Sequence, residues 1–189
     1  SAQSWQWQIT PAYGQLVVVE TTEYQYFGFV AGIQTGALDG LRVPVAYQKT
    51  EQELLQAQPQ IFEFLKTNFT CALAGYAIEQ QLWYVAPPLP PKLHAFVRSA
   101  QPAELQQFFQ NYQFLHLLFS SANAAQPQVD ELLLAIFQRG QAVLDLRPSL
   151  PAFAQLFANL VGRDYQRLRR FLGRLETVLA AKDLAEKSA

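Results

Sequence analysis

A proline-rich run near the middle of the chain most strongly limits what the sequence can fold into. The run is Ala86-Pro87-Pro88-Leu89-Pro90-Pro91. Proline fixes φ and has no backbone amide donor, so the run excludes a helix or an interior strand and is typical of polyproline II structure. We therefore predict a connector at 86–91 between a β-rich domain at 1–88 and an α-helical domain at 92–189. The alternative is a ligand for an aromatic-lined groove, because Pro87 to Lys92 has PxxPxK spacing.

The residues before the run alternate between apolar and polar side chains and are rich in β-branched and aromatic types, a pattern that predicts strands. The Asp39-Gly40 pair predicts a tight turn between two of these strands. Thr50-Glu51-Gln52-Glu53 matches a capping box, so a helical insertion is expected at about 50–67. The expected strands are 5–8, 16–22, 24–33, 41–48, 69–78 and 82–85.

The residues after the run carry apolar side chains at helical spacing. Pro102 and Pro127 suit a first helical turn, and Gly162 can separate two helices. Together the two patterns predict an α+β fold. Its N-terminal half would be a small antiparallel twisted sheet or barrel-like sheet with the helical insertion, and its C-terminal half would be α-helical. The expected helices are 102–121, 127–145, 150–161 and 163–186.

The last expected helix has an apolar face and a basic face. Guanidinium groups bind carboxylates and phosphates through paired hydrogen bonds, so an exposed basic face predicts partner binding. An acidic protein surface is the favoured target, RNA is second and an anionic membrane is third. A solvated face with intrahelical ion pairs is the structural alternative. The predicted partner-binding residues are Arg163, Arg167, Arg169, Arg170 and Arg174. Of these, Arg167, Arg170 and Arg174 are expected to be largely exposed.

The helix expected at 102–121 is apolar on more than one side. Phe114, Leu117 and Leu118 lie on the flanks of its main apolar stripe, and one packing face could not cover them all. Only 15% of the chain is charged, which leaves little polar surface to shield such residues. We therefore predict that these three residues form an apolar interface with a second copy or another protein.

Residues suited to catalysis or metal binding are few. His94, His116 and Cys71 have no partner residue at catalytic or metal-ligand spacing. We expect the histidines to be packed in the core or an interface and the cysteine to be buried. Asp130-Glu131 is expected in a first helical turn, where it would complement the helix dipole. The sequence thus predicts no catalytic residues, no metal and no cofactor.

The net charge of −1 gives no whole-protein attraction to nucleic acid. No apolar run approaches the roughly 20 residues of a membrane span, and the first residues lack a signal-peptide pattern, so we expect a cytoplasmic protein without a transmembrane segment. The favoured function is a non-catalytic adaptor, assembly factor or regulatory subunit that docks on a larger complex through the basic helix and the apolar helical surface. An RNA-binding protein using the same helix is the alternative, and an enzyme with an unrecognised site is third.

Overall fold

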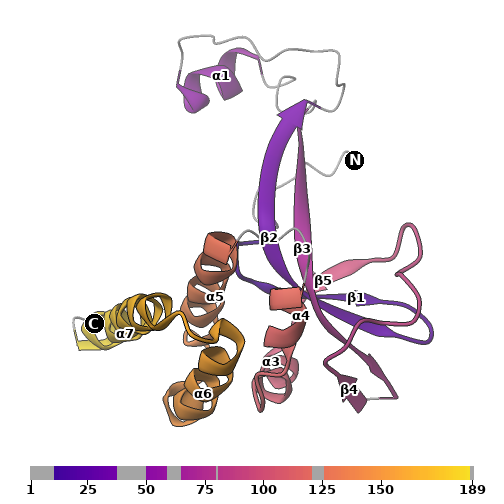
Figure 1. Ribbon diagram of the computed structural model, residues 1–189. Coiled ribbons are helices and arrows are strands. Elements are labelled where there is room, and N and C mark those ends of the chain that lie inside the picture. The colour runs from indigo at the N-terminus through magenta and orange to yellow at the C-terminus, as the bar shows by residue number, and fades with distance from the viewer. Residues whose placement is uncertain (1–10, 38–49, 59–64, 80, 121–125, 188–189) are drawn as a thin grey trace.

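The computed structural model describes residues 11–37, 50–58, 65–79, 81–120 and 126–187. The strands are β1 Leu16–Glu20, β2 Gln25–Ala37, β3 Leu65–Ile78, β4 Gln81–Trp83 and β5 Val97–Ser99. The helices are α1 Glu51–Ala57, α3 Pro102–Phe108, α4 Phe114–Ser120, α5 Gln126–Gly140, α6 Leu150–Val161 and α7 Tyr165–Lys187, with a short 3₁₀ helix at Arg147–Ser149. The long β2–β3 pair stands out from the body, with α1 near its far end (Figure 1).

The strands form one open, antiparallel sheet in the order β4-β3-β2-β1-β5. The α+β fold with C-terminal helices is therefore confirmed, in its sheet form and not its barrel-like form. β5 lies beyond the proline-rich run and pairs with β1. The sheet thus includes strands from both sides of the run. β5 was not expected from the sequence, because three residues are too few to show an alternating pattern.

Several expected elements differ from those observed. The prediction of a single helix at 102–121 is wrong, because the helix is interrupted between α3 and α4. There Asn111 Oδ1 accepts the amide of Gln113 at 3.1 Å, and such local bonds compete with helical ones. α5 ends at Gly140 rather than at 145. In the expected insertion at 50–67, α1 ends at Ala57 and β3 already begins at Leu65, while residues 59–64 lie outside the described residues. The expected elements at 5–8, 39–40 and 41–48 lie outside the described residues.

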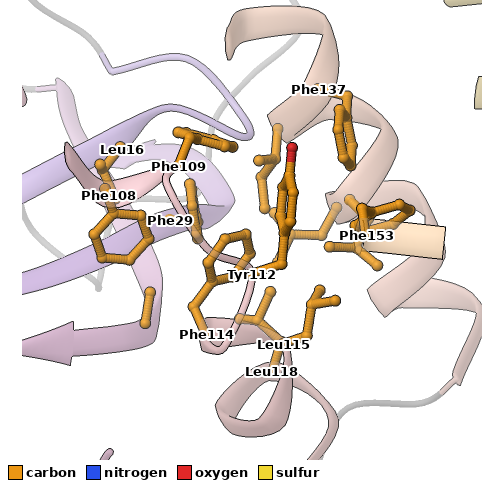
Figure 2. Close-up of a cluster of buried hydrophobic side chains, with 14 of the residues drawn as sticks. Leu16, Phe29, Phe108, Phe109, Tyr112, Phe114, Leu115, Leu118, Phe137 and Phe153 are labelled. Atoms are coloured by element: carbon orange, nitrogen blue, oxygen red, sulfur yellow. The ribbon is translucent and has the colours of Figure 1, made fainter. Parts of the chain in front are cut away.

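One buried cluster joins the sheet to the helices. Phe29 lies on the helix-facing side of the sheet, with its ring centroid 5.2 Å from that of Phe114 in α4. Tyr112 continues the cluster, with its ring 6.0 Å from Phe114 and 5.3 Å from Phe153 in α6 (Figure 2). Burying one such phenylalanine stabilises the fold by about 1.5–3 kcal/mol, so this aromatic series is a major source of stability.

The predicted apolar interface at Phe114, Leu117 and Leu118 is corrected by this packing. Phe114 is fully buried and Leu118 is 2% exposed, while Leu117 is half-buried. α4 is short and lies between the sheet and α6, so its apolar residues face neighbours on several sides within this chain. The excess of apolar residues at 114–118 therefore reflects a central position in the core.

The turn before β1 is pressed against α5. Gly14 has φ +79°, and a Cβ placed there would lie 2.6 Å from the backbone carbon of Ala135. The Gly14 amide also donates to the carbonyl of Val30 at 2.8 Å. Only glycine allows this approach, which brings Tyr13 to the edge of α5. No helix within the described ranges has the length and hydropathy needed to cross a membrane.

Candidate interaction surface on the last helix

The helix α7 is fixed by its apolar face and by its first turn. Phe171, Leu175 and Leu179 are buried and belong to the common core. At its start, Asp164 Oδ1 accepts the backbone amide of Arg167 at 2.9 Å, which satisfies one of the amides that a helix leaves unpaired. These contacts set which arginines turn inward and which turn outward.

Arg167 turns inward, so its predicted exposure is wrong. Its side chain is 6% exposed and its Nη2 donates to Asp130 Oδ1 at 2.7 Å, while Nε donates to Oδ2 at 3.0 Å. The guanidinium carbon also lies 5.3 Å from the ring centroid of Phe119, within cation–π range. Arg167 lies one turn before Phe171 and therefore on the packing side of the helix.

Arg174 lies at the margin of the α5–α7 contact. Both of its terminal nitrogens donate to Glu131, with Nη2 at 2.9 Å from Oε2. These bonds lower the pKa of the Glu131 carboxyl and raise that of Arg174. The two side chains are about half exposed, at 49% and 53%. An open groove of about 410 Å³ adjoins the pair, and Tyr13 forms part of its wall.

These contacts correct the expectation for Asp130-Glu131. The two carboxylates lie after the first turn of α5 and bind arginines of α7. Sequence spacing gave no sign of this, because each carboxylate is 37 or 43 residues from its arginine. The sequence predicted an acidic surface on another protein as the partner of these arginines. For Arg167 and Arg174, the carboxylates come instead from α5 of the same chain.

The remaining arginines, Arg163, Arg169 and Arg170, are exposed, and their side chains make no hydrogen bond or ion pair with another described residue. Arg169 and Arg170 lie one turn before Gly173, which is also exposed. Gly173 is two residues from both Phe171 and Leu175, so it occupies the side of α7 opposite the core. We call Arg169, Arg170 and Gly173, together with Arg163 in the turn before α7, the outer α7 surface.

The residues considered for catalysis lie apart from this surface. His94 and His116 are exposed, so neither is a core side chain. Cys71 is also exposed, contrary to expectation, yet desolvation by its surroundings raises the pKa of its thiol to about 11. A thiol with that pKa is protonated near neutral pH and is a weak nucleophile. Within the described ranges, no three His, Cys, Asp or Glu residues are grouped closely enough to hold a metal.

The chain matches no protein-family model, no curated protein and no solved structure in the comparisons made. The function is therefore inferred from the chemistry of these surfaces.

Proposed function

We propose that this chain is a non-catalytic adaptor, assembly factor or regulatory subunit of the cytoplasm that docks on a larger protein complex through the outer α7 surface. The observation that carries the proposal is the contrast among the arginines. Arg167 and Arg174 bind carboxylates of α5, whereas Arg163, Arg169 and Arg170 have no such partner among the described residues. Carboxylates on another protein would complement them in the same way.

Gly173 supports the proposal independently of charge. A glycine inside a helix costs about 1 kcal/mol relative to alanine. A Cβ at Gly173 would meet no atom within 4 Å, so packing within the described part of the chain does not require glycine there. A partner that approaches the α7 backbone closely would require it. An acidic helix lying across Gly173, with its carboxylates beside Arg169 and Arg170, fits both features.

The test is capture of a partner from native lysate with matched charge variants. The Arg169→Glu/Arg170→Glu variant should bind the captured protein at least about tenfold more weakly than the unchanged chain, because like charges would then face each other. The control is Lys66→Glu/Arg139→Glu, which makes the same change in net charge at other exposed positions. It should keep binding. Equal capture by both double variants would contradict the proposal.

Gly173→Ala separates docking from stability. The substitution should stabilise the isolated chain against denaturant by about 1 kcal/mol, because alanine is the better helix former. It should nevertheless weaken capture of the same partner, since the added methyl group lies where the partner would approach the α7 backbone. Stabilisation with unchanged capture would show that no partner approaches this position.

RNA is the alternative target of the same arginines. It predicts that nucleic acid copurifies with the chain, which an ultraviolet absorbance spectrum would reveal, and that nuclease treatment abolishes capture. Capture that survives nuclease and is lost in Arg169→Glu/Arg170→Glu favours the protein partner.

A further inference from the structure

The strand β5 forms one edge of the sheet, on the side away from α5, α6 and α7 (Figure 1). Its pairing with β1 includes a bond from the Glu20 amide to the Phe96 carbonyl at 3.3 Å and one from the Ala100 amide to the Leu16 carbonyl at 3.0 Å. Hydrogen-bonded pairs alternate along an antiparallel ladder. Val97 and Ser99 therefore turn their backbone amides and carbonyls away from β1.

Most of these outward groups have no hydrogen-bond partner in the described part of the chain. The Ser99 carbonyl accepts a bond from Arg98 Nη1 at 3.2 Å, but the Val97 amide, the Val97 carbonyl and the Ser99 amide bind no described residue. Charged side chains commonly shield such edges. Here the Arg98 side chain forms ion pairs with Glu20 and Glu104, each at 2.6 Å, on the side of the sheet that faces the core. It therefore does not shield the edge.

The segment leading into β5 is also unusually apolar for a surface. Leu93 is 91% exposed and Phe96 is 88% exposed, while Val97 is 44% exposed. Lys92 is the one Asp, Glu, Lys or Arg residue between 83 and 97. Exposed apolar side chains next to open backbone groups are typical of a strand that pairs with another chain.

We infer that β5 pairs with β5 of a second copy of this chain, antiparallel across a two-fold axis, so that the two sheets become continuous. The edge is complementary to itself: centring the pair on Arg98 places Val97 of each copy opposite Ser99 of the other, and donors meet acceptors in both directions. Phe96 then lies beside Ala100 of the second copy. The two Arg98 side chains meet at the axis, each already neutralised by carboxylates.

This pairing moves the self-association expected from the sequence away from the buried residues of α4. It does not depend on the outer α7 surface, because α7 lies on the other side of the molecule (Figure 1). The two surfaces can therefore be tested separately, and either can fail without the other.

The test is light scattering on the purified full chain over a dilution series from micromolar to near-millimolar. The mass should rise from 21.4 kDa toward twice that value as the concentration increases.

Val97→Pro removes an outward amide without removing a bond to β1, and proline is tolerated at such edge positions. By symmetry the dimer loses two hydrogen bonds, so dimerisation should weaken about thirtyfold. Val97→Thr keeps the amide and the branched shape and is the control.

A second pair of variants tests the apolar part without altering the strand. Leu93→Gln/Phe96→Gln should weaken dimerisation about tenfold, whereas Val143→Gln, at another exposed apolar position, should not. A monomeric mass at every concentration would overturn the inference. A dimer that Val97→Pro and Val97→Thr weaken equally, or that Leu93→Gln/Phe96→Gln leaves intact, would do so too.

Discussion

Two ion pairs join α5 to α7, and they differ mainly in their exposure to water. Asp130 and Glu131 are adjacent in sequence, and each binds an arginine through two nitrogens. The side chains of the Arg167–Asp130 pair are 6% and 10% exposed, whereas those of the Arg174–Glu131 pair are 49% and 53% exposed. The same chemistry is therefore present once in the core and once at the surface.

The two pairs show that geometry alone does not determine how much an ion pair contributes to the free energy of unfolding. An exposed pair is weakened by solvent and salt and contributes about 0–1 kcal/mol. A buried pair adds little over an apolar replacement, because desolvation offsets its attraction, but breaking it leaves a charge without a partner in the core. Arg167 should therefore tolerate change poorly and Arg174 well.

The largest effect is expected from Arg167→Ala. It leaves the Asp130 carboxylate buried without its cation and removes the contact with Phe119, so the free energy of unfolding should fall by about 3–5 kcal/mol. Urea denaturation followed by circular dichroism measures the change. A loss below about 1 kcal/mol would show that water reaches Asp130 and that the two pairs are alike.

A second variant separates the cost of breaking the buried pair from the value of having it. Asp130→Leu/Arg167→Met removes both charges and fills the space with apolar atoms. It should recover most of the stability lost in Arg167→Ala, about 2–4 kcal/mol. If the double variant is as unstable as the single one, the pair itself, and not the unpaired carboxylate, holds α5 against α7.

Both arginines look alike in the sequence, and this explains what could and could not be predicted. Features that depend on a few adjacent residues were found, such as the Thr50–Glu53 capping box and the separation of two helices at Gly162. Arg167 was wrongly placed on the exposed basic face of α7, although it lies one turn before the buried Phe171. How wide the buried face of α7 is depends on α5 and α4. Those elements lie far away in the sequence, so spacing along α7 could suggest the side of Arg167 but not its buried partner Asp130.

β5 also depends on a distant part of the chain, whereas much of the outer α7 surface follows from local spacing. β5 is strand because β1 offers it an unpaired edge, not because its three residues favour strand structure. The exposure of Arg170 was expected from helical phase, and Arg169 was among the predicted partner-binding residues. The outward position of Gly173 could have been found in the same way, since it is two residues from Phe171 and from Leu175.

The third expected effect is small and concerns Arg174→Ala. The free energy of unfolding should fall by no more than about 1 kcal/mol, because the pair is half exposed. The difference from the unchanged chain should shrink further when salt is added, since exposed charges are screened. Denaturation at low and high salt provides the measurement. A loss as large as that of Arg167→Ala would remove the contrast between the two pairs.

The smallest effect is the pH dependence of the exposed pair. Hydrogen bonds from Arg174 lower the pKa of Glu131 below its ordinary value of 4.5, so the unfolded chain binds this proton more readily than the folded chain does. The stabilisation is therefore complete above the ordinary pKa and is lost as the pH falls through the lowered pKa of the folded chain.

Glu20 and Glu104 also have lowered pKa values, so acid alone would weaken the fold for several reasons. Comparing the unchanged chain with Glu131→Gln at each pH removes those shared contributions. Their difference in unfolding free energy should be less than about 1 kcal/mol at neutral pH and should vanish in acid. A difference that stays constant through the acid range would mean that the Glu131 side chain acts through packing and not through its charge.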